Sequence, residues 1–139
     1  MKYWLLKTEP EEWSWKNQLK CGSKGSSWDG VRNYQARNNL KKMRFGDQSF
    51  FYHTGKEKKI VGIVKITKEF FPDKSDITGK FVSIMVRSHK SFKSHVSLND
   101  IKKHSFLRHL PIVKQSRLSV MMIDSKSWKV ICKMGKINT

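Results

Sequence analysis

Residues 26–38 read Ser-Ser-Trp-Asp-Gly-Val-Arg-Asn-Tyr-Gln-Ala-Arg-Asn, a run that joins a turn, a helix start and several aromatic and basic side chains. Asn33 is a favoured N-cap residue, so the run predicts a helix over about residues 34–43. Aromatic faces, guanidinium groups and the free N–H groups of a helix's first turn are what proteins use to hold a flat base beside a phosphate. Trp28 and Arg32 therefore indicate a ligand site, with core packing of Trp28 as the alternative interpretation.

The predicted helix has one apolar face. Ala36, Leu40 and Met43 recur at i, i+4 and i+7 and are expected to face the core. Arg37 and Lys41 then lie on other sides of the helix, where they are solvated or meet a ligand. The run therefore anchors a helix on the core and leaves its basic residues at the surface.

The chain has 139 residues, the size of one domain, and we expect a single domain over residues 1–139. Its formal net charge is +18 at pH 7, which favours binding to polyanions, chiefly nucleic acids. Of its 29 basic residues 23 are lysine and six are arginine, so a general preference for lysine at the surface explains part of the charge equally well. The arginines are more telling, because two of the six, Arg32 and Arg37, fall within the run above.

No apolar run is long enough to cross a membrane, and the apolar part of residues 1–7 is too short for a signal sequence. We therefore expect a cytoplasmic protein with no membrane partner. Cys21 and Cys132 lie far apart and lack a CxxC spacing, which indicates neither a zinc site nor a disulfide framework. Both are expected to be reduced thiols.

Alternating apolar and aromatic residues predict several short strands. These strands are expected over residues 2–8, 48–54, 59–70, 80–89 and the end of 115–123. Gly62, inside the third of them, indicates a bend or a close backbone approach. Residues 21–27 are rich in glycine and serine and predict a loop, and Leu110-Pro111 predicts a break in the chain.

Capping residues predict short helices in addition to 34–43. Ser14 is expected to cap a helix that ends near Leu19, Ser97 to cap one over 98–104, and Ser125 or Ser127 to open one that Gly135 closes. Strands and helices do not alternate regularly, which argues against a parallel sheet. The sequence predicts an α+β fold, a twisted and mostly antiparallel sheet curled into a small barrel and decorated by short helices.

The chain carries few of the patterns that enzymes need. Its five histidines are scattered without metal-ligand spacing, and it has no GxSxG elbow, no P-loop and no GxGxxG run. Glu9, Glu11 and Glu12 cluster beside Pro10, where capping of a helix start explains them. His53, at the end of an aromatic strand, is the most site-like histidine, and the alternative is a core or rim histidine bonded to the backbone. We expect no metal, no cofactor and no catalytic residue.

Five runs together carry a resemblance to a known family. They are Tyr3–Pro10, Trp28–Asn38, Gly46-Asp47 with Phe51–His53, Ile60–Val64 and Gln115–Val120. On these runs the chain resembles the EVE domain, a member of the PUA-like superfamily. The eleven residues of Trp28–Asn38 are the most specific of them. Thr8 is a departure, because the family more often has serine there, but a hydroxyl group is retained.

The resemblance implies a PUA-like pseudobarrel that reads nucleic acid and does not catalyse a reaction. Relatives with this architecture, including the YTH domains, hold a modified base in an aromatic pocket. EVE domains are thought to hold modified cytosines in DNA, or modified RNA bases, in the same way. The resemblance therefore implies modified DNA or RNA as the partner, and we expect a monomer.

The resemblance also implies a set of site residues. The modified-base pocket is expected to include Lys7, Thr8, Trp28, Gly30, Val31, Asn33, Tyr34, Tyr52, His53 and Ser116. Flanking phosphates are expected to be bound by Arg32, Arg37 and Arg117. In this arrangement the base stacks on an aromatic ring of the set, and the polar members read its edge.

Two other functions stay open on the sequence. One is a general RNA-binding domain that acts on transfer or ribosomal RNA, with an affinity that follows charge and salt and not base modification. The other is an enzyme of base or nucleotide metabolism that uses His53 with an acid such as Glu9.

Overall fold

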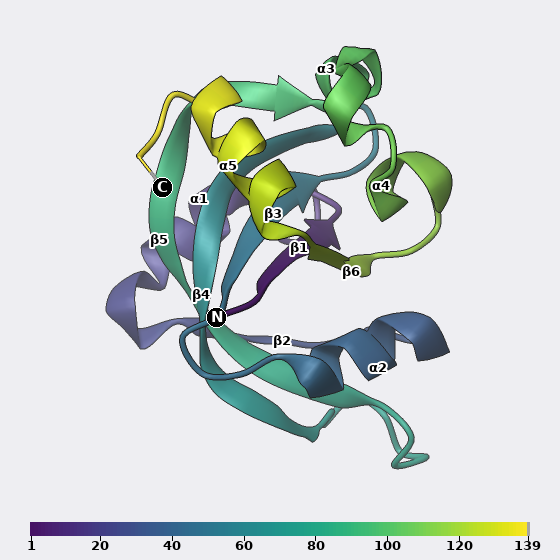
Figure 1. The fold of residues 1–139 in the computed structure, drawn as a ribbon. Coiled ribbons are helices and arrows are strands. Elements are labelled where there is room, and N and C mark those ends of the chain that lie inside the picture. Colours follow the sequence, from purple (N-terminus) through teal and green to yellow (C-terminus); the bar gives the residue numbers. More distant parts are fainter. Residues whose placement is uncertain (139) are drawn as a thin grey trace.

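One six-stranded sheet forms the body of the structure, a computed structural model that describes residues 1–138 (Figure 1). The strand order is β2-β5-β4-β3-β1-β6. The strands are β1 (Tyr3–Thr8), β2 (Ser26–Trp28), β3 (Gln48–His53), β4 (Lys59–Pro72), β5 (Val82–Ser97) and β6 (Val120–Ile123). Four of the five strand pairs are antiparallel and the β1–β3 pair is parallel. The predicted mostly antiparallel sheet is confirmed.

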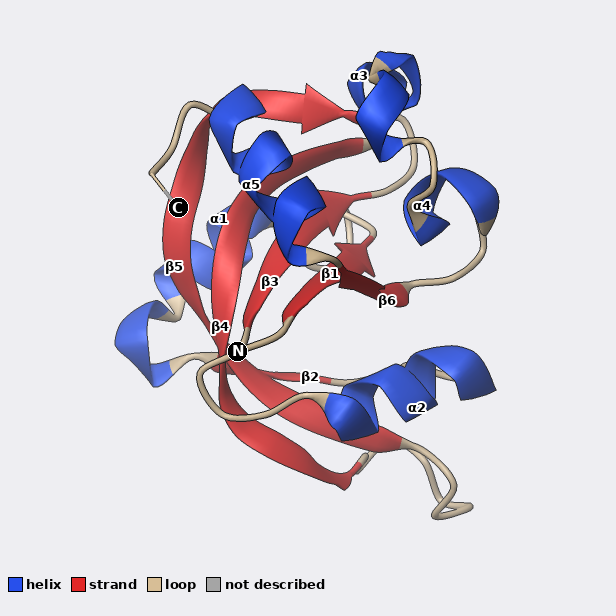
Figure 2. Ribbon diagram, in the orientation of Figure 1, coloured by secondary structure: helices blue, strands red, loops and turns tan. Residues whose placement is uncertain are grey.

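Short helices surround the curved sheet (Figure 2). The α-helices are α1 (Trp15–Lys20), α2 (Tyr34–Lys42), α3 (Leu98–Lys103), α4 (Pro111–Lys114) and α5 (Ser125–Met134), and 3-10 turns cover Gly22–Lys24 and Ser105–Leu107. In Figure 1, α5 packs near the top of β5, and α2 packs near the bottom against β5 and β6. None of the helices in residues 1–138 has both the length and the apolar character needed to span a membrane. The α+β class is confirmed.

Strand β1 lies inside the sheet, between β3 and β6, and carries the centre of the core. Trp4, Leu5 and Leu6 are fully buried. Because both of its faces are covered, β1 is apolar at consecutive positions and not at every second one. The strand becomes partly exposed at its C-terminal end, at Lys7 and Thr8.

The helix predicted from residues 26–38 is α2. Its N-cap is Asn33, whose Oδ1 accepts a hydrogen bond from Ala36 N at 2.9 Å. The predicted apolar face is confirmed, because Ala36, Leu40 and Met43 are fully buried. Met43 follows the last helical residue and does not belong to the helix.

The other predicted helix starts are confirmed. Ser14 caps α1 and Ser97 caps α3, each with a reciprocal side-chain bond. Helix α5 begins at Ser125, one of the two serines expected to open it, and its N-cap is Asp124, whose carboxylate accepts the N–H of Ser127 at 3.0 Å. Gly135 closes α5 as predicted.

Three further predictions are corrected by the structure. Residues 26–28 form an edge strand where a loop was expected, because they pair with residues 84–86 of β5. Strand β5 continues to Ser97, since its polar second half pairs with β4. Pro111 begins α4 where a chain break was expected, because the fixed backbone angle of proline suits the first helical position.

Gly62 of β4 allows the indole of Trp15 to pack on the sheet. A Cβ atom at Gly62 would lie 2.4 Å from Trp15 Cζ2, so the predicted close approach is confirmed, with an indole ring as the partner in place of a backbone. Trp15 Nε1 donates to Ser91 Oγ at 2.9 Å, and the ring meets Phe51 edge to face with centroids 4.9 Å apart. These contacts fix α1 on the sheet.

Replacing Gly62 with alanine should destabilise the protein, because the added methyl group would overlap the Trp15 ring. Overpacking of this kind costs about 1–3 kcal/mol, whereas the same change at an unstrained, open position stabilises by about 0.4–1 kcal/mol. Urea unfolding of the wild type and the variant measures whether the substitution lowers or raises the free energy of unfolding. In the Trp15→Leu variant, Gly62→Ala should lower the free energy of unfolding by less than it does in the wild type. An equal loss in both proteins would contradict the packing of Trp15 on Gly62.

Candidate functional site

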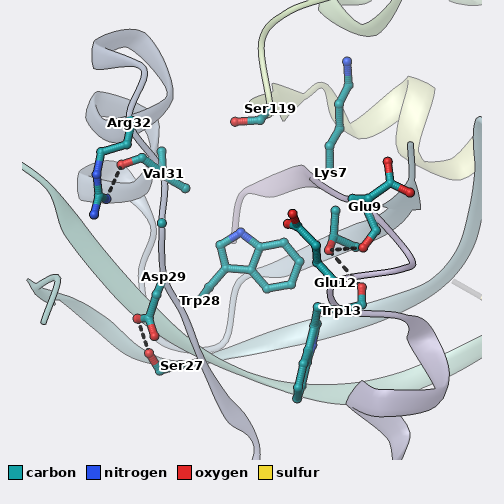
Figure 3. A pocket seen from close by; sticks show the side chains of 12 residues that line it. Lys7, Glu9, Glu12, Trp13, Ser27, Trp28, Asp29, Val31, Arg32 and Ser119 are labelled. Atoms are coloured by element: carbon teal, nitrogen blue, oxygen red, sulfur yellow. Dashed lines mark hydrogen bonds between the residues drawn. The ribbon is translucent and has the colours of Figure 1, made fainter. Parts of the chain in front are cut away.

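A cavity of about 380 Å³ opens at the C-terminal end of β1 (Figure 3). We call it the Trp28 cavity, and its volume falls in the range of about 300–1,000 Å³ that small-molecule sites occupy. It lies between the end of β1 with the turn that follows, the segment 27–32, and Ser119 before β6. Its lining residues are Lys7, Thr8, Glu9, Glu12, Trp13, Ser27, Trp28, Asp29, Gly30, Val31, Arg32 and Ser119.

Trp28 forms one wall of the cavity and also belongs to the core. It is the last residue of β2, which pairs it with Ile84 of β5. Its indole meets Phe51 edge to face with centroids 5.6 Å apart, and 8% of the residue is exposed. Figure 3 shows the indole between the Val31–Arg32 segment and Glu12. Core packing, the alternative made from the sequence, therefore holds for Trp28. The same residue lines the cavity, and ligand binding there stays a prediction.

Gln18 connects the two tryptophans that line the cavity. It is fully buried in α1, and its Oε1 accepts hydrogen bonds from Trp13 Nε1 at 2.8 Å and from Ser26 Oγ at 3.1 Å. Ser26 begins β2, the strand that ends at Trp28. One amide oxygen therefore fixes both the Trp13 indole and the strand that carries Trp28. Gln18 Nε2 is buried without a hydrogen-bond partner in residues 1–138.

Asp73 fixes the loop on the other side of the cavity. Its buried carboxylate accepts hydrogen bonds from Gly30 N at 2.8 Å, from Arg32 Nη1 at 3.0 Å and from Ser75 N at 2.8 Å. Burial by itself would raise the pKa of Asp73, but the hydrogen bonds from Ser75, Gly30 and Arg32 outweigh it and lower the pKa to about 2. The carboxylate is therefore charged at neutral pH. It holds Gly30, whose positive φ of 84° suits glycine, in its turn.

Arg32 lines the cavity, but its guanidinium group is already paired. It donates to Asp73 and, through Nη2, to Ser75 Oγ at 3.0 Å, and it lies over the Phe81 ring at 5.3 Å from the centroid. The ion pair with Asp73 offsets the charge of Arg32, and its phosphate-binding role stays a prediction. With 42% of its side chain exposed, Arg32 forms part of the cavity wall.

Carboxylates line the cavity although the chain as a whole is strongly basic. Glu9, Glu12 and Asp29 line it together with Lys7. In Figure 3 the Glu12 carboxylate lies beside the Trp28 indole, whereas the Asp29 carboxylate turns to Ser27. Burial lowers the pKa of Lys7, and its Nζ donates to the backbone oxygen of Ser116 at 3.0 Å. Carboxylates accept hydrogen bonds from amino groups, and indole rings stack on flat rings. The cavity is therefore suited to a planar ligand that presents amino donors.

Six residues predicted from the sequence line this cavity. They are Lys7, Thr8, Trp28, Gly30 and Val31 of the expected base pocket, together with Arg32. Thr8 also has a structural role. Its Oγ1 donates a hydrogen bond to Trp13 O at 2.8 Å and so fixes the turn after β1. Among residues 1–138, no three or more histidine, cysteine, aspartate or glutamate side chains are grouped so as to hold a metal ion.

Several lining residues were missed by the sequence analysis. They are Glu12, Trp13, Ser27, Asp29 and Ser119, while Glu9 was named only as the acid of the enzyme alternative. Most of them could have been found from the sequence, because they are neighbours of predicted site residues. Residues 9–13 directly follow β1, and residues 27 and 29 flank Trp28. Gln18 and Asp73 had no such signal, since each acts through partners brought close by the fold.

Tyr34, Asn33 and Arg37 do not line the Trp28 cavity. Tyr34, with 52% of its surface exposed, stacks on Phe81 with centroids 5.2 Å apart, and the Arg37 guanidinium lies 4.8 Å from its ring centroid. The Asn33 side chain is engaged in capping α2. Arg37 Nη2 donates to Asn38 Oδ1 at 2.9 Å. Tyr34 and Asn33 therefore do not share the Trp28 cavity, and a part for them in base binding stays a prediction.

His53 is a buried structural residue and does not line the Trp28 cavity. Its Nε2 accepts a hydrogen bond from Trp15 N at 3.0 Å, and its Nδ1 lies 2.9 Å from Glu57 Oε1. Both ring nitrogens are therefore engaged by the protein. His53 therefore lies outside the Trp28 cavity, and the alternative made from the sequence, a histidine bonded to the backbone, agrees with the structure.

Tyr52 and Ser116 line a second cavity, of about 320 Å³, on the other side of Lys7. We call it the Tyr52 cavity. Arg117 lies at the surface, in a hollow that it shares with Asn33 and Gln35. The structure thus divides the expected site among the two cavities, this hollow, the surface at Tyr34 and Arg37, and the interior at His53. The phosphate-binding role of Arg117 stays a prediction.

Replacing Asp73 with asparagine should destabilise the protein by about 2 kcal/mol near pH 7, from the lowering of the pKa from 3.8 to about 2. The folded pKa lies below the unfolded one, so the carboxylate stabilises the fold above about pH 4 and stops doing so as the pH falls through about 2. Urea unfolding across this pH range should show that the wild type and Asp73→Asn differ less in free energy of unfolding as the pH falls. Glu11→Gln, an exposed acid outside the network, serves as control. A difference that stays constant down to pH 2 would contradict the assignment.

The comparisons with known proteins identify relatives over the whole chain. Residues 2–134 match the family model of the EVE domain. Thymocyte nuclear protein 1 of Gallus gallus is 31% identical over 161 residues, which cover 93% of this chain and 66% of that protein. The chain spans between 36% and 66% of the length of the first curated relatives that it matches.

Solved structures share the fold. Rpa0253 from Rhodopseudomonas palustris is 42% identical with a TM-score of 0.92, over 98% of this chain and 94% of that one. The human THYN1 protein, solved in complex with DNA containing 5-methylcytosine, is 25% identical with a TM-score of 0.89 over 100% of both chains. At 16% identity and a TM-score of 0.60, the YTH domain of Zygosaccharomyces rouxii MRB1 shares the fold alone, over 99% of this chain and 89% of that one. The chain belongs to the EVE domain family and has its PUA-like fold.

Proposed function

We propose that the protein binds nucleic acid and reads one modified base, which it holds outside the strand in the Trp28 cavity. The observation that carries this proposal is the lining of that cavity, where Trp13 and Trp28 meet carboxylates around about 380 Å³. This size and this combination of groups suit a single planar heterocycle. The net charge of +18 and the complex of the human relative with 5-methylcytosine DNA support the proposal.

Stacking on Trp28 supplies the main contact with the base in this proposal. A base–aromatic contact contributes about 1–3 kcal/mol, against a few kcal/mol for extruding a base from a duplex. The packing of Trp28 on Phe51 fixes the indole before any ligand arrives. Little side-chain entropy is therefore lost on binding, which favours affinity.

The polar edge of the base faces Glu9, Glu12 and Lys7 in this arrangement. A carboxylate accepts a hydrogen bond from an exocyclic amino group such as N4 of cytosine, and the lysine ammonium donates to a base carbonyl. An acceptor beside a donor favours cytosine over thymine or uracil, which lack the amino group. A methyl group adds about 1–3 kcal/mol of selectivity where apolar walls exclude water.

Backbone phosphates are bound by exposed basic groups outside the Trp28 cavity. Arg37 and Arg117 are at the surface and keep the role predicted for them, whereas Arg32 is held by Asp73. Surface lysines add a weaker attraction that falls as salt rises.

A general RNA-binding module is the second candidate, and the charge of +18 favours it. It predicts an affinity that follows salt and ignores base modification. Carboxylates at a cavity mouth repel phosphates, so a module that only follows the backbone gains nothing from Glu9 and Glu12. The enzyme alternative has less support, because Trp15 and Glu57 engage both ring nitrogens of its proposed base, His53.

Trp28→Leu should remove most of the preference for a modified base and leave salt-dependent binding to plain strands. The loss of stacking, about 1–3 kcal/mol, weakens binding of the modified strand by about 5- to 150-fold. Leucine is chosen because alanine would leave a larger void beside Phe51. Fluorescence anisotropy with short DNA and RNA carrying one cytosine or one 5-methylcytosine, at about 50 and 200 mM salt, measures both quantities.

Tyr34→Leu is the matched control, because Tyr34 is an exposed aromatic residue of the same sequence run that lies outside the cavity. It should leave the preference unchanged, and thermal melts should show that both variants remain folded. An equal loss for modified and plain strands in Trp28→Leu, or a lost preference in Tyr34→Leu, would place the base elsewhere.

Glu12→Ala should reduce the discrimination between cytosine and thymine at the read position. A hydrogen bond to a charged group contributes about 1.5–3 kcal/mol, so the ratio of the two affinities should fall by about tenfold or more. Competition between two labelled strands that differ only at this base measures the ratio. Glu11→Ala, an exposed neighbour that does not line the cavity, is the control. An unchanged ratio in Glu12→Ala would assign the amino group to another acceptor.

A further inference from the structure

The Tyr52 cavity differs from the Trp28 cavity in charge. It lies where the end of β3, the turn 54–58, α3 and α4 meet. Its lining residues are Lys7, Tyr52, Thr54, Gly55, Lys58, Leu98, Lys102, Ile112 and Ser116. Three of these are lysines and none is acidic, whereas three carboxylates line the Trp28 cavity. Lys7 lines both cavities.

Tyr52 provides an observation that is independent of the lysines. The parallel pairing of β1 and β3 places it opposite Lys7, whose Nζ lies 5.7 Å from its ring centroid. Only 3% of Tyr52 is exposed, yet its hydroxyl group forms no hydrogen bond with residues 1–138. Burial raises the pKa of Tyr52 to about 12, so the group stays a donor at neutral pH. Among the described residues Gln18 Nε2 is the one fully buried side-chain polar atom without a partner, so the Tyr52 hydroxyl group is accessible from the cavity that it lines, and a ligand there can accept its hydrogen bond.

The walls of the Tyr52 cavity are fixed in advance. Lys58 has a positive φ of 46°, which is unusual outside glycine, and its backbone oxygen accepts the N–H of Leu98 at 2.8 Å. This bond joins the turn 54–58 to the start of α3. Ile112 of α4 contributes a buried apolar wall.

The lysines of this cavity have donors to spare. An ammonium group has three N–H donors, and Lys7 uses one on Ser116 O at 3.0 Å. Glu9 lies close by and accepts from Thr54 Oγ1 at 3.3 Å, but it lines the Trp28 cavity and not this one. One partly buried lysine, Lys7, and two exposed ones, Lys58 and Lys102, line this cavity beside a hydroxyl donor without an acceptor. This combination makes a site for an anion rich in oxygen.

We propose that the Tyr52 cavity binds the backbone phosphate next to the base held in the Trp28 cavity, through Lys7, Lys58, Lys102 and the Tyr52 hydroxyl group. This inference rests on the proposed function. Because Lys7 lines both cavities, the groups bound in them are neighbours along one strand. The phosphate fixes the strand while the base is extruded, so this site adds affinity and carries no base preference.

The test replaces the two exposed lysines of the Tyr52 cavity and leaves Lys7 in place. Lys58→Asn with Lys102→Gln removes two charges, and asparagine tolerates the backbone angle of position 58. Lys129→Gln with Lys133→Gln, on exposed positions of α5, removes the same charge elsewhere. The double variant of the Tyr52 cavity should bind modified and plain strands equally less well, with a salt slope lower by about 1, and should keep the base preference. A loss no larger than that of the α5 control would overturn the proposal.

Neutral linkages then locate the phosphate. Oligonucleotides carry one methylphosphonate on either side of the read base. At one of the two positions, the methylphosphonate should lower the affinity of the wild type for the strand as much as the two lysine substitutions do. The same methylphosphonate should not lower the affinity of the double variant any further. If the losses of binding free energy from the methylphosphonate and from the lysine substitutions add, the assignment of that phosphate to the Tyr52 cavity is overturned. Displacement of the strand from the wild type, but not from the double variant, by low concentrations of inorganic phosphate would assign the cavity to a free anion and overturn the strand assignment.

Tyr52→Phe tests the hydroxyl group separately. It should leave the free energy of unfolding unchanged, because no bond within the described chain is lost, and should weaken all strands by about tenfold, as for a hydrogen bond to a charged group. Unchanged strand affinity would remove Tyr52 from the site. Failure of the proposed function is a separate result, because it shows in the wild type alone as equal affinity for modified and plain strands.

Discussion

The parallel pairing of β1 with β3 is the constraint on which the rest of the structure depends. Parallel neighbours cannot be joined by a tight turn, so the chain between them has to cross back along the sheet. That crossing carries α1, β2 and α2, and it brings Trp13 and Trp28 to the C-terminal end of β1. The same pairing sets Lys7 opposite Tyr52. Both cavities, and the lysine between them, therefore follow from one strand pairing.

Buried hydrogen bonds, and not apolar packing alone, keep the Trp28 cavity open. Gln18 fixes Trp13 and the strand of Trp28 through one oxygen atom, and Asp73 fixes the opposite loop through Gly30 and Arg32. These bonds restrict the motion of both walls, although Gln18 Nε2 is left without a partner among residues 1–138. A cavity with fixed walls loses little entropy when a ligand enters. The edge contact of Trp28 with Phe51 continues this rigidity into the core.

Features with a local physical cause could be predicted from the sequence. Asn33 and Ser14 cap their helices as expected, because a cap depends on a few neighbouring residues, and the run 26–38 led correctly to a cavity beside Trp28. The orientation of Tyr34 and Tyr52 could not be predicted. An aromatic residue type indicates packing or ligand contact, but it does not say to which side of the sheet the side chain points. That side is set by helix placement and strand register. The bonds of Asp73 to residues about forty positions away carry no local signal at all.

The central claim is that a single base leaves its strand and lies against the indole of Trp28. Intermolecular nuclear Overhauser effects in the complex with an oligonucleotide containing 5-methylcytosine test it most directly, because the five tryptophans give few and separable indole signals. The account predicts contacts between the cytosine methyl protons and the ring protons of Trp28, with Trp13 nearby. Methyl contacts restricted to lysine side chains at the surface, with the Trp28 signals unmoved, would contradict it.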